Sequence, residues 1–324
     1  MSMVRAFVAF GVALVFPGVT IAQNYPVKPI RIISSIPLGG SGDVAIRMAA
    51  AKMSETIGQV VLVETNGAGG GLVAARSVAR SAPDGYTLFH SSSGPLAGSM
   101  YLSKEPGYDV VKDFAPISLV SDAPSVLVVN ASVPVHSVKE LVDYAKRNPG
   151  KLSFASNGVG SYFHLVGETF KNAAGIDVLH VPYTGGNMSL PLNDLLSGRI
   201  DIFFPTVALA GAHMTGGKIR PLAVLGESRL KRLPDVPTMK EAFPAYSPIR
   251  SWFALVGPAG LPKAVVARLH GEIVKSLADP QLSARMTDLG MVPVGSTPEA
   301  LASVMKNTME RIAQAAKELG IQPQ

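Results

Sequence analysis

The sequence contains no cysteine in 324 residues. The chain therefore has no disulfide, no thiolate metal site and no cysteine nucleophile. Charged residues are also few, at 16% of the chain, against 47% hydrophobic residues. This balance is typical of a folded globular protein and argues against a disordered chain, and the length suffices for about two domains.

Long hydrophobic runs are missing except at the N-terminus. There a single basic residue, Arg5, precedes an apolar run, and small residues follow up to Ala22. This pattern predicts a secretory signal peptide over residues 1–22, cleaved after Ala22, and hence export to the periplasm. An N-terminal anchor helix is the alternative, but Pro17 and Gly18 end the run well before the ~20 residues that a membrane span needs.

A strong excess of one charge sign is also missing. The formal net charge is +6, and removal of residues 1–22, in which Arg5 is the only charged residue, leaves +5. The basic residues are scattered and are not interleaved with aromatic residues, so no nucleic-acid partner is expected. The excess supports at most a weak general attraction for small anions.

Short β-rich segments alternate with helical segments along the chain, usually with a small-residue loop between them. This alternation predicts an α/β fold with mainly parallel sheets, and ligands bind such folds at the carboxyl ends of the strands. Two long apolar strands, at residues 123–132 and 249–256, are expected to connect two lobes. The first lobe is predicted to comprise residues 23–122 and 246–324, and the second lobe residues 123–245.

Three glycine-rich loops share one construction, with a strand before the loop and a helix after it. They are SSIPLGGSGD (residues 34–43), ASNGVGSYFH (155–164) and VPYTGGNMS (181–189). Glycine lets backbone N–H groups approach a ligand closely, and the following helix N-terminus adds unpaired donors and partial positive charge. The pattern predicts anion binding by both lobes, and ordinary turn chemistry is the alternative.

The anion predicted from these loops is a carboxylate rather than a nucleotide. No glycine loop carries the lysine of a phosphate-binding P-loop. A dinucleotide-binding fingerprint over residues 67–72 fails, because Leu72 stands where the last glycine is required. The loops contain no lysine or arginine, and neutral donors suit a reversibly held carboxylate better than a polyphosphate.

Catalytic and metal-binding patterns are weak in this sequence. His164 and Glu168 are four residues apart on a predicted helix and face the same side, but no third metal ligand is suggested nearby. His180 and the other histidines read as ordinary strand, loop or helix residues. No metal, cofactor or catalytic residue is expected, and a hydrolase or lyase with His164 as its base is the alternative function. Asp43 is interpreted as a helix N-cap that orders the first loop.

Long stretches of the chain resemble one known family. They include PLGGSGDVAIRMAA, GQVVLVETNGAGGGLVAARSVARSAPDGYTL, LSFASNGVGSYFHLVGETF, VPYTGGNMSLPLNDLLSGRIDIFF and GPAGLPKAVVARLHGEI, in matching order. The sequence is similar to the substrate-binding receptors of tripartite tricarboxylate transporters, the TctC or Bug family. That resemblance implies a two-lobe, Venus-flytrap periplasmic binding protein of type II, a monomer that closes on a small carboxylate and delivers it to a membrane transporter. A ligand-dependent signalling adaptor shares the same site and is a further alternative.

The resemblance and the loops together indicate a set of ligand-binding residues. From the first lobe these are Ser34, Ser35, Pro37, Leu38, Gly39, Gly40, Asp43 and Ser92. From the second lobe they are Asn157, Gly160, Ser161, Tyr162, His164, Tyr183, Gly185, Gly186, Asn187, Phe204 and Thr206. Among the aromatic residues beside the loops, Tyr162 is predicted to cover the ligand with its ring.

Three departures from the family pattern bear on the ligand. Leu38 stands where the family usually has a second proline, and Tyr162 replaces another usual proline. Pro205 and Thr206 occupy the position at which many relatives carry an aspartate. The bulkier apolar side chains in the loops predict a carboxylate ligand with an aromatic or otherwise apolar body rather than citrate. The absence of the aspartate disfavours a ligand that carries an amino group, such as an amino acid.

Overall fold

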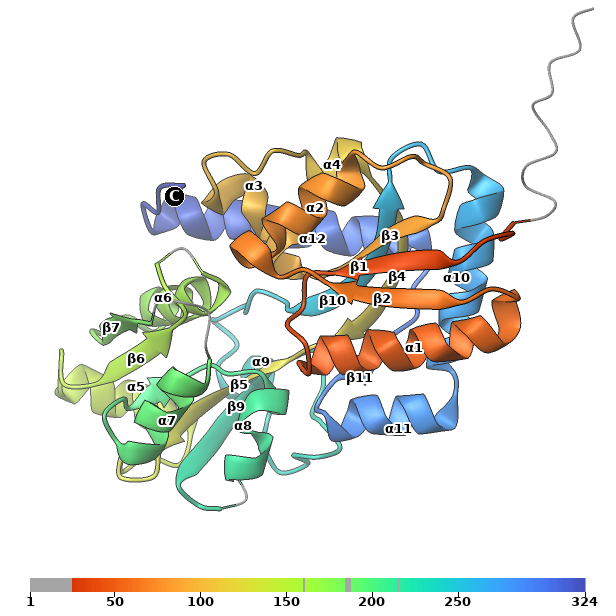
Figure 1. Ribbon diagram of the computed structural model, residues 1–324. Helices are drawn as coiled ribbons and strands as arrows, with labels where there is room; N and C mark the ends of the chain where they lie inside the picture. Colours follow the sequence, from red (N-terminus) through yellow and green to blue (C-terminus); the bar gives the residue numbers. More distant parts are fainter. Residues whose placement is uncertain (1–24, 160, 184–187, 215, 324) are drawn as a thin grey trace, which may run out of the picture.

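The computed structural model describes residues 25–159, 161–183, 188–214 and 216–323. Within these ranges the chain forms two β-sheets, each covered by helices. In Figure 1 the first sheet lies at the upper right and the second at the lower left. The signal peptide predicted over residues 1–22 lies outside the described residues. No helix in the described part of the chain is both long and apolar enough to cross a membrane.

Each sheet collects strands from distant parts of the chain. The first sheet has the strand order β11–β4–β10–β3–β1–β2, and the second has the order β7–β6–β8–β5–β9. The strands of the first sheet are β1 (Ile30–Ser34), β2 (Val61–Thr65), β3 (Thr87–Ser92), β4 (Phe114–Asp122), β10 (Trp252–Pro258) and β11 (Val292–Pro293). Those of the second are β5 (Ser125–Asn130), β6 (Ser153–Ser156), β7 (Leu179–Pro182), β8 (Ile202–Phe203) and β9 (Ile219–Leu225). We propose that each sheet is the core of one lobe, divided at the boundaries that the sequence predicts.

Most strands of each sheet run in one direction, and the strand that crosses between the lobes runs against them. β1 is parallel to β2 and β3, and β6 is parallel to β7 and β8. β10, in contrast, is antiparallel to β3 and β4, and β5 is antiparallel to β8 and β9. A strand that arrives from the other lobe enters its sheet at the end where the parallel strands finish, so it must run against them. The prediction of a two-lobe α/β fold, with mainly parallel sheets and two crossing strands, is confirmed.

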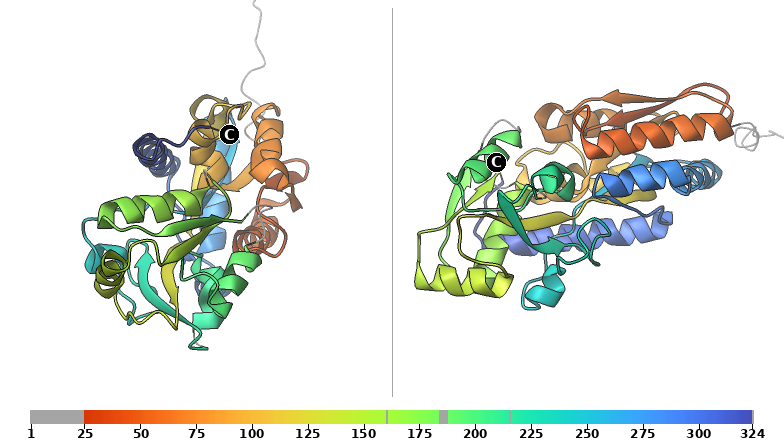
Figure 2. Two further views of the ribbon diagram at one scale, coloured as in Figure 1. Left: turned by 90° about the vertical axis from the view of Figure 1, so that its left-hand side faces the viewer. Right: turned by 90° about the horizontal axis from the view of Figure 1, so that it is seen from below.

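Helices cover both faces of the first sheet (Figures 1 and 2). One face packs against α1 (Ser41–Ile57), α10 (Lys263–Leu277) and α11 (Pro280–Asp288). The other packs against α2 (Leu72–Ala79) and α12 (Pro298–Glu318), with the short elements η1 (Ala68–Gly71), η2 (Gly94–Gly98), α3 (Ser99–Leu102) and α4 (Val110–Asp113) nearby. The second sheet is flanked by α5 (Val138–Arg147), α6 (Tyr162–Ala174), α7 (Ser189–Ser197), α8 (Val207–Met214) and α9 (Met239–Ala242).

Several helix ends follow from the local sequence. Gly58 ends α1 with a φ of +83°, a conformation that favours glycine. Thr297 caps α12 by accepting the Ala300 N–H at 3.2 Å, and Pro298 occupies the first turn. Strand β4 has no clear counterpart in the sequence pattern. Pro116 and Ser118 interrupt its sequence FAPISLVSD, and its strand conformation depends on pairing with β10.

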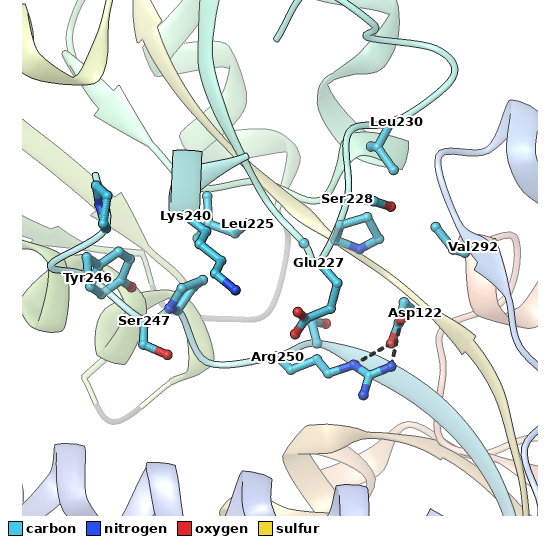
Figure 3. A pocket seen from close by; sticks show the side chains of 15 residues that line it. Asp122, Leu225, Glu227, Ser228, Leu230, Lys240, Tyr246, Ser247, Arg250 and Val292 are labelled. Carbon is cyan, nitrogen blue, oxygen red and sulfur yellow. Dashed lines mark hydrogen bonds and ion pairs between the residues drawn. The ribbon is translucent and has the colours of Figure 1, made fainter. Parts of the chain in front are cut away.

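The two segments that connect the lobes, residues 122–124 and 249–251, form a hinge in which they lie side by side. The Ala123 N–H donates to the Ser251 carbonyl oxygen at 3.0 Å. Arg250 donates from Nε and Nη2 to the two carboxylate oxygens of Asp122, at 2.8 Å for each contact (Figure 3). These contacts hold the end of β4 against the start of β10, so both connections cross between the lobes at one place.

A buried tryptophan attaches α12 to the strand that leaves the hinge. Trp252, the only tryptophan in the sequence, is fully buried, and its Nε1 donates to Thr308 Oγ1 at 3.0 Å. The Thr308 hydroxyl in turn donates to the Val304 carbonyl at 2.8 Å. Because a buried indole N–H needs an acceptor, this bond fixes the position of α12 against β10.

Replacement of Thr308 by valine removes the acceptor of the Trp252 N–H while keeping the side-chain volume. Because an unpaired buried donor is costly, we expect the free energy of unfolding to fall by about 2 kcal/mol. Urea unfolding followed by tryptophan fluorescence measures the change. Ser303→Ala, on the exposed side of α12, is the control and should change the free energy by less than about 0.5 kcal/mol. Equal losses in the two variants would contradict the role given to this bond.

Candidate functional site

A cleft of about 680 Å³ lies between the two lobes. On the first lobe it is lined by the loop after β1, the glycine segment of η1 and the helical segment after β3. On the second lobe it is lined by the loop after β6, the start of α6 and the segment after β8, while Ser251 and Phe253 border it from the hinge side. The cleft therefore collects the carboxyl ends of strands from both sheets, which is where α/β folds bind ligands.

None of the described residues that line the cleft has a charged side chain. The apolar part of the lining includes Leu72, Leu102, Phe163, Leu209 and Phe253. The polar part consists of backbone groups, the Asn157 amide and hydroxyls from Ser41, Ser92, Ser93, Ser99, Ser103, Ser161, Thr206 and Ser251. An anionic group of a ligand in this cleft would therefore be contacted by neutral hydrogen-bond donors. The apolar part of the same ligand would contact apolar side chains.

Asp43 lies behind the first loop, but its carboxylate is already engaged. It accepts hydrogen bonds from the Gly39 N–H at 3.0 Å, from Arg47 Nε at 3.0 Å and from the Thr65 hydroxyl at 3.2 Å. Burial raises the pKa of Asp43, but the hydrogen bonds outweigh it and hold the pKa below its usual range. The expected N-cap role is wrong, because Gly40 is the N-cap and Asp43 is the third residue of α1. The expected ordering of the loop is confirmed by the bond to Gly39.

The start of α1 presents backbone donors to the cleft. The first N–H groups of a helix have no intrahelical partner, and Gly40 offers those of α1 no side-chain cap. Gly39 has a φ of +79°, and a Cβ on Gly42 would lie 3.0 Å from the Phe253 ring. Glycine is therefore needed both for the turn and for the close approach of α1 to β10. An uncapped N-terminus of this kind favours a negative group.

Tyr162, the first residue of α6, links the cleft to the hinge. Its ring lines the cleft and meets Phe163 edge-on, with ring centroids 5.2 Å apart. Its hydroxyl donates to the Ile249 carbonyl at 3.0 Å. Burial raises the pKa of Tyr162 to about 12, so the hydroxyl stays protonated and remains a donor at neutral pH. One side chain thus contacts both the cleft and a segment that crosses between the lobes.

Part of the predicted binding set lines the cleft, namely Pro37, Gly39, Gly40, Ser92, Asn157, Ser161, Tyr162 and Thr206. Ser34 and Ser35 are buried behind the first loop, where their hydroxyls lie 3.1 Å from His90 Nδ1 and 2.7 Å from Ser91 Oγ. Leu38 is 75% exposed beside the loop. Outside the described residues lie Gly160, Gly185, Gly186 and Asn187.

Three further predicted residues have side chains engaged elsewhere in the second lobe. Phe204 is 1% exposed and packs edge-on against Phe170, because it continues β8 with its ring toward the core. The Tyr183 hydroxyl donates to an Asp194 carboxylate oxygen at 2.6 Å. His164 packs against another histidine ring rather than into the cleft. Ligand contact by these three residues stays a prediction.

Some cleft residues had little or no signal in the sequence. Gly69 and Gly70 belong to a glycine segment that was considered only as a failed dinucleotide fingerprint. Leu102 follows the small-residue segment SSSGPLAGS (residues 91–99), in which the sequence predicts ligand contact for Ser92 alone. Phe253 lies within an apolar strand, and its place at the cleft depends on where β10 enters the sheet, so no local pattern marks it.

A second cavity, of about 290 Å³, lies at the hinge and shares Ser251 with the cleft. Its lining includes Glu227, Lys240 and the Asp122–Arg250 ion pair (Figure 3). It is smaller than the cleft, and none of the glycine-rich loops lines it in the described part of the chain. The larger cleft is therefore the candidate ligand site.

One group of possible metal ligands occurs among the described residues, formed by His164, Glu168 and His180. His180 is the third ligand that the sequence did not suggest. It lies on β7, and only the packing of β7 beside α6 brings it to the other two. None of the three residues lines the cleft.

Comparison with known proteins identifies one family. A family model described as the tripartite tricarboxylate transporter family receptor matches residues 45–321. The periplasmic binding protein BugD is 33% identical with a TM-score of 0.77, over 93% of this chain and 100% of BugD. Rpa4515 of R. palustris, solved with adipate, is 30% identical with a TM-score of 0.80, over 93% and 100% of the two chains. MatC from Rhodopseudomonas palustris, solved with bound malate, is 27% identical with a TM-score of 0.74, over 90% and 99%.

Replacement of Asp43 by asparagine should lower the free energy of unfolding at neutral pH by about 2 kcal/mol, because an amide cannot replace the carboxylate in its bonds to Arg47 and Gly39. Folding lowers the pKa of Asp43, so its stabilising effect is complete above the unfolded-state value of about 3.9 and is lost as the pH falls through the folded-state value. Urea unfolding at about pH 7 and about pH 3 measures the difference between the two proteins, which should shrink at the lower pH.

The exposed acid Asp235 provides the control for this experiment. Asp235→Asn should leave the free energy of unfolding within about 0.5 kcal/mol of the unmodified protein at both pH values. A loss in Asp43→Asn that is the same at both pH values would argue against an ionised, hydrogen-bonded Asp43.

Proposed function

The chain belongs to the tripartite tricarboxylate transporter receptor family, and on that premise we propose that it binds a small organic carboxylate in the interlobe cleft as an extracytoplasmic receptor. We further propose that it acts in the periplasm as a monomer and delivers the ligand to the membrane components of such a transporter. The observation that carries the proposal is the cleft of about 680 Å³, which is lined by glycine loops of both lobes and has no charged side chain among its described residues.

Neutral donors hold the carboxylate in this proposal. The uncapped start of α1 supplies backbone N–H groups at the positive end of the helix dipole. Hydroxyls of Ser92 and Ser161 face the same cleft from opposite lobes. Because each hydrogen bond to an ionised group is worth about 1.5–3 kcal/mol, a few such donors suffice for a ligand that must also be released.

The lining favours a carboxylate with an apolar body. Leu72, Leu102 and Phe253 offer apolar contact to the part of the ligand between or beyond its carboxylates. A ligand ammonium group would lack an anionic partner, because Asp43 is bonded to the loop and to Arg47. Adipate in Rpa4515 and malate in MatC are both dicarboxylates, and of the two the longer, less polar adipate resembles the ligand proposed here. We propose an aromatic or long aliphatic carboxylate rather than citrate or an amino acid.

Ligand binding without catalysis is the mechanism we propose. Closure of the two lobes about the hinge brings donors from both sides onto the ligand, and the ligand stabilises the closed form by contacts available only there. A hydrolase or lyase needs a general base at the cleft, and His164 does not line it. BugD is a periplasmic binding protein and MatC was solved with bound malate, which agrees with this assignment.

Thermal unfolding against a panel of aliphatic and aromatic mono- and dicarboxylates tests the proposal. A ligand at a hundred times its dissociation constant stabilises the folded protein by about 2.7 kcal/mol, so the unfolding temperature should rise clearly for one class of acids. Adipate and benzoate represent the apolar-bodied class, and citrate and aspartate the disfavoured ones. Stabilisation by citrate or aspartate alone would overturn the ligand class, and no stabilisation by any acid would overturn the carboxylate assignment.

Ser92→Asp places a negative charge in the cleft and should weaken binding of the stabilising acid by at least about tenfold, because like charges repel strongly in a partly dry site. Calorimetric titration measures the affinity. Ser303→Asp makes the same chemical change on the exposed side of α12 and should leave the affinity unchanged. If both variants bind equally well, the ligand does not occupy this cleft.

Tyr162→Ala and Tyr162→Phe separate the ring from the hydroxyl. If the ring covers an apolar ligand body, Tyr162→Ala weakens binding by about tenfold and Tyr162→Phe by less than about threefold. Equal weakening in both would assign the effect to the bond between the hydroxyl and the Ile249 carbonyl in the hinge.

A further inference from the structure

The packing of β7 beside α6 brings together three side chains that do not line the carboxylate cleft. His164 and Glu168 lie one turn apart on α6, and His180 lies on β7. The ligand atoms that these three residues offer lie within 4.8 Å of one another. The two imidazole rings stack with centroids 4.3 Å apart. His164 is 7% exposed, so the group is largely shielded from solvent.

We propose that His164, Glu168 and His180 bind one divalent transition-metal ion of the class that prefers imidazole ligands, such as Zn²⁺ or Ni²⁺. Two imidazoles and one carboxylate form a recurrent zinc ligand set, and imidazole is also a ligand of nickel and copper. The site is separate from the proposed carboxylate site, because none of the three residues lines the cleft. Its occupation would tie the first turns of α6 to the edge strand β7.

Contacts on one nitrogen and on one face hold the His180 ring in place. Its Nε2 lies 2.7 Å from Ser156 Oγ, and the same hydroxyl oxygen accepts the Gly158 N–H at 3.1 Å. The opposite ring face packs on Phe154, with centroids 4.8 Å apart. Because the Ser156 hydroxyl donates to the Gly158 carbonyl oxygen at 3.2 Å, it accepts from Nε2–H of His180, which leaves the Nδ1 lone pair for a metal.

Lys171 is the cation that a metal must displace. Its Nζ lies 3.0 Å from a Glu168 carboxylate oxygen, and the two side chains are 18% and 17% exposed. A tetrahedral site with bonds of about 2.1 Å sets its ligand atoms about 3.4 Å apart, so the group contracts on binding by rotation of its side chains. Glu168 must leave its ion pair with Lys171 to bind the metal. Removal of the lysine charge should therefore increase the affinity for the metal.

Calorimetric titration of the mature chain, produced without a histidine tag, with ZnCl₂ and with NiCl₂ tests this site. We expect about one ion per chain and a dissociation constant of about 1 μM or below at about pH 7.5. Titration with CoCl₂ adds a spectroscopic readout, because Co²⁺ in a tetrahedral site of this kind absorbs visible light strongly. Absence of binding, or binding without a change in the Co²⁺ spectrum, would overturn the proposal.

Variants identify the ligands. His180→Gln should weaken binding by about a hundredfold or more, and Ser156→Ala, which frees the ring, by about tenfold. Lys171→Met should tighten binding by about tenfold, a gain that unfolding or loosened packing would not produce. His136→Gln, at an exposed histidine, is the control and should leave the affinity unchanged. Equal weakening in the control, or no gain from Lys171→Met, would contradict the assignment.

Discussion

Arg250 and Asp122 meet where the chain crosses between the lobes, and their two-pronged ion pair joins the two connections at one hinge. The adjacent backbone hydrogen bond between Ala123 and Ser251 extends the pairing of β4 with β10 into the hinge. This constraint sets the direction of both crossing strands, which is why each sheet is mixed. It also brings the carboxyl ends of the remaining strands of both sheets to a common cleft, so the ligand site depends on it.

The chemistry of that cleft is defined by what its described residues lack. Nearby charges are neutralised inside the protein, as Asp43 is by Arg47 and the Gly39 N–H. What remains for a ligand is a set of neutral donors and apolar side chains. Neutral donors stabilise a carboxylate without offering a partner to an ammonium group, so selectivity follows from polarity as well as from shape.

The first turn of α6 combines three tasks in neighbouring residues. Ser161 caps the helix and lines the cleft, and Tyr162 lines the cleft while bonding to the Ile249 carbonyl in the hinge. His164 turns away from the cleft and packs on His180 of β7. Because consecutive helical residues point in different directions, one turn contacts the ligand site, the hinge and the neighbouring strand. The proposed metal site and the proposed carboxylate site therefore share a helix but no lining residue.

Local pattern determined much of this protein: the alternation of strands and helices, the ends of α1 and α12, the glycine loops that reach the cleft and the family itself. These features are set by residues close together in the chain, through strand and helix periodicity, capping and turn conformation. Only the tertiary structure decided which strands run antiparallel, that β4 exists, that Phe253 borders the cleft and Phe204 does not, and that His180 joins His164 and Glu168. Each of these depends on contacts between segments far apart in sequence, and no local pattern records which partner a strand or side chain meets.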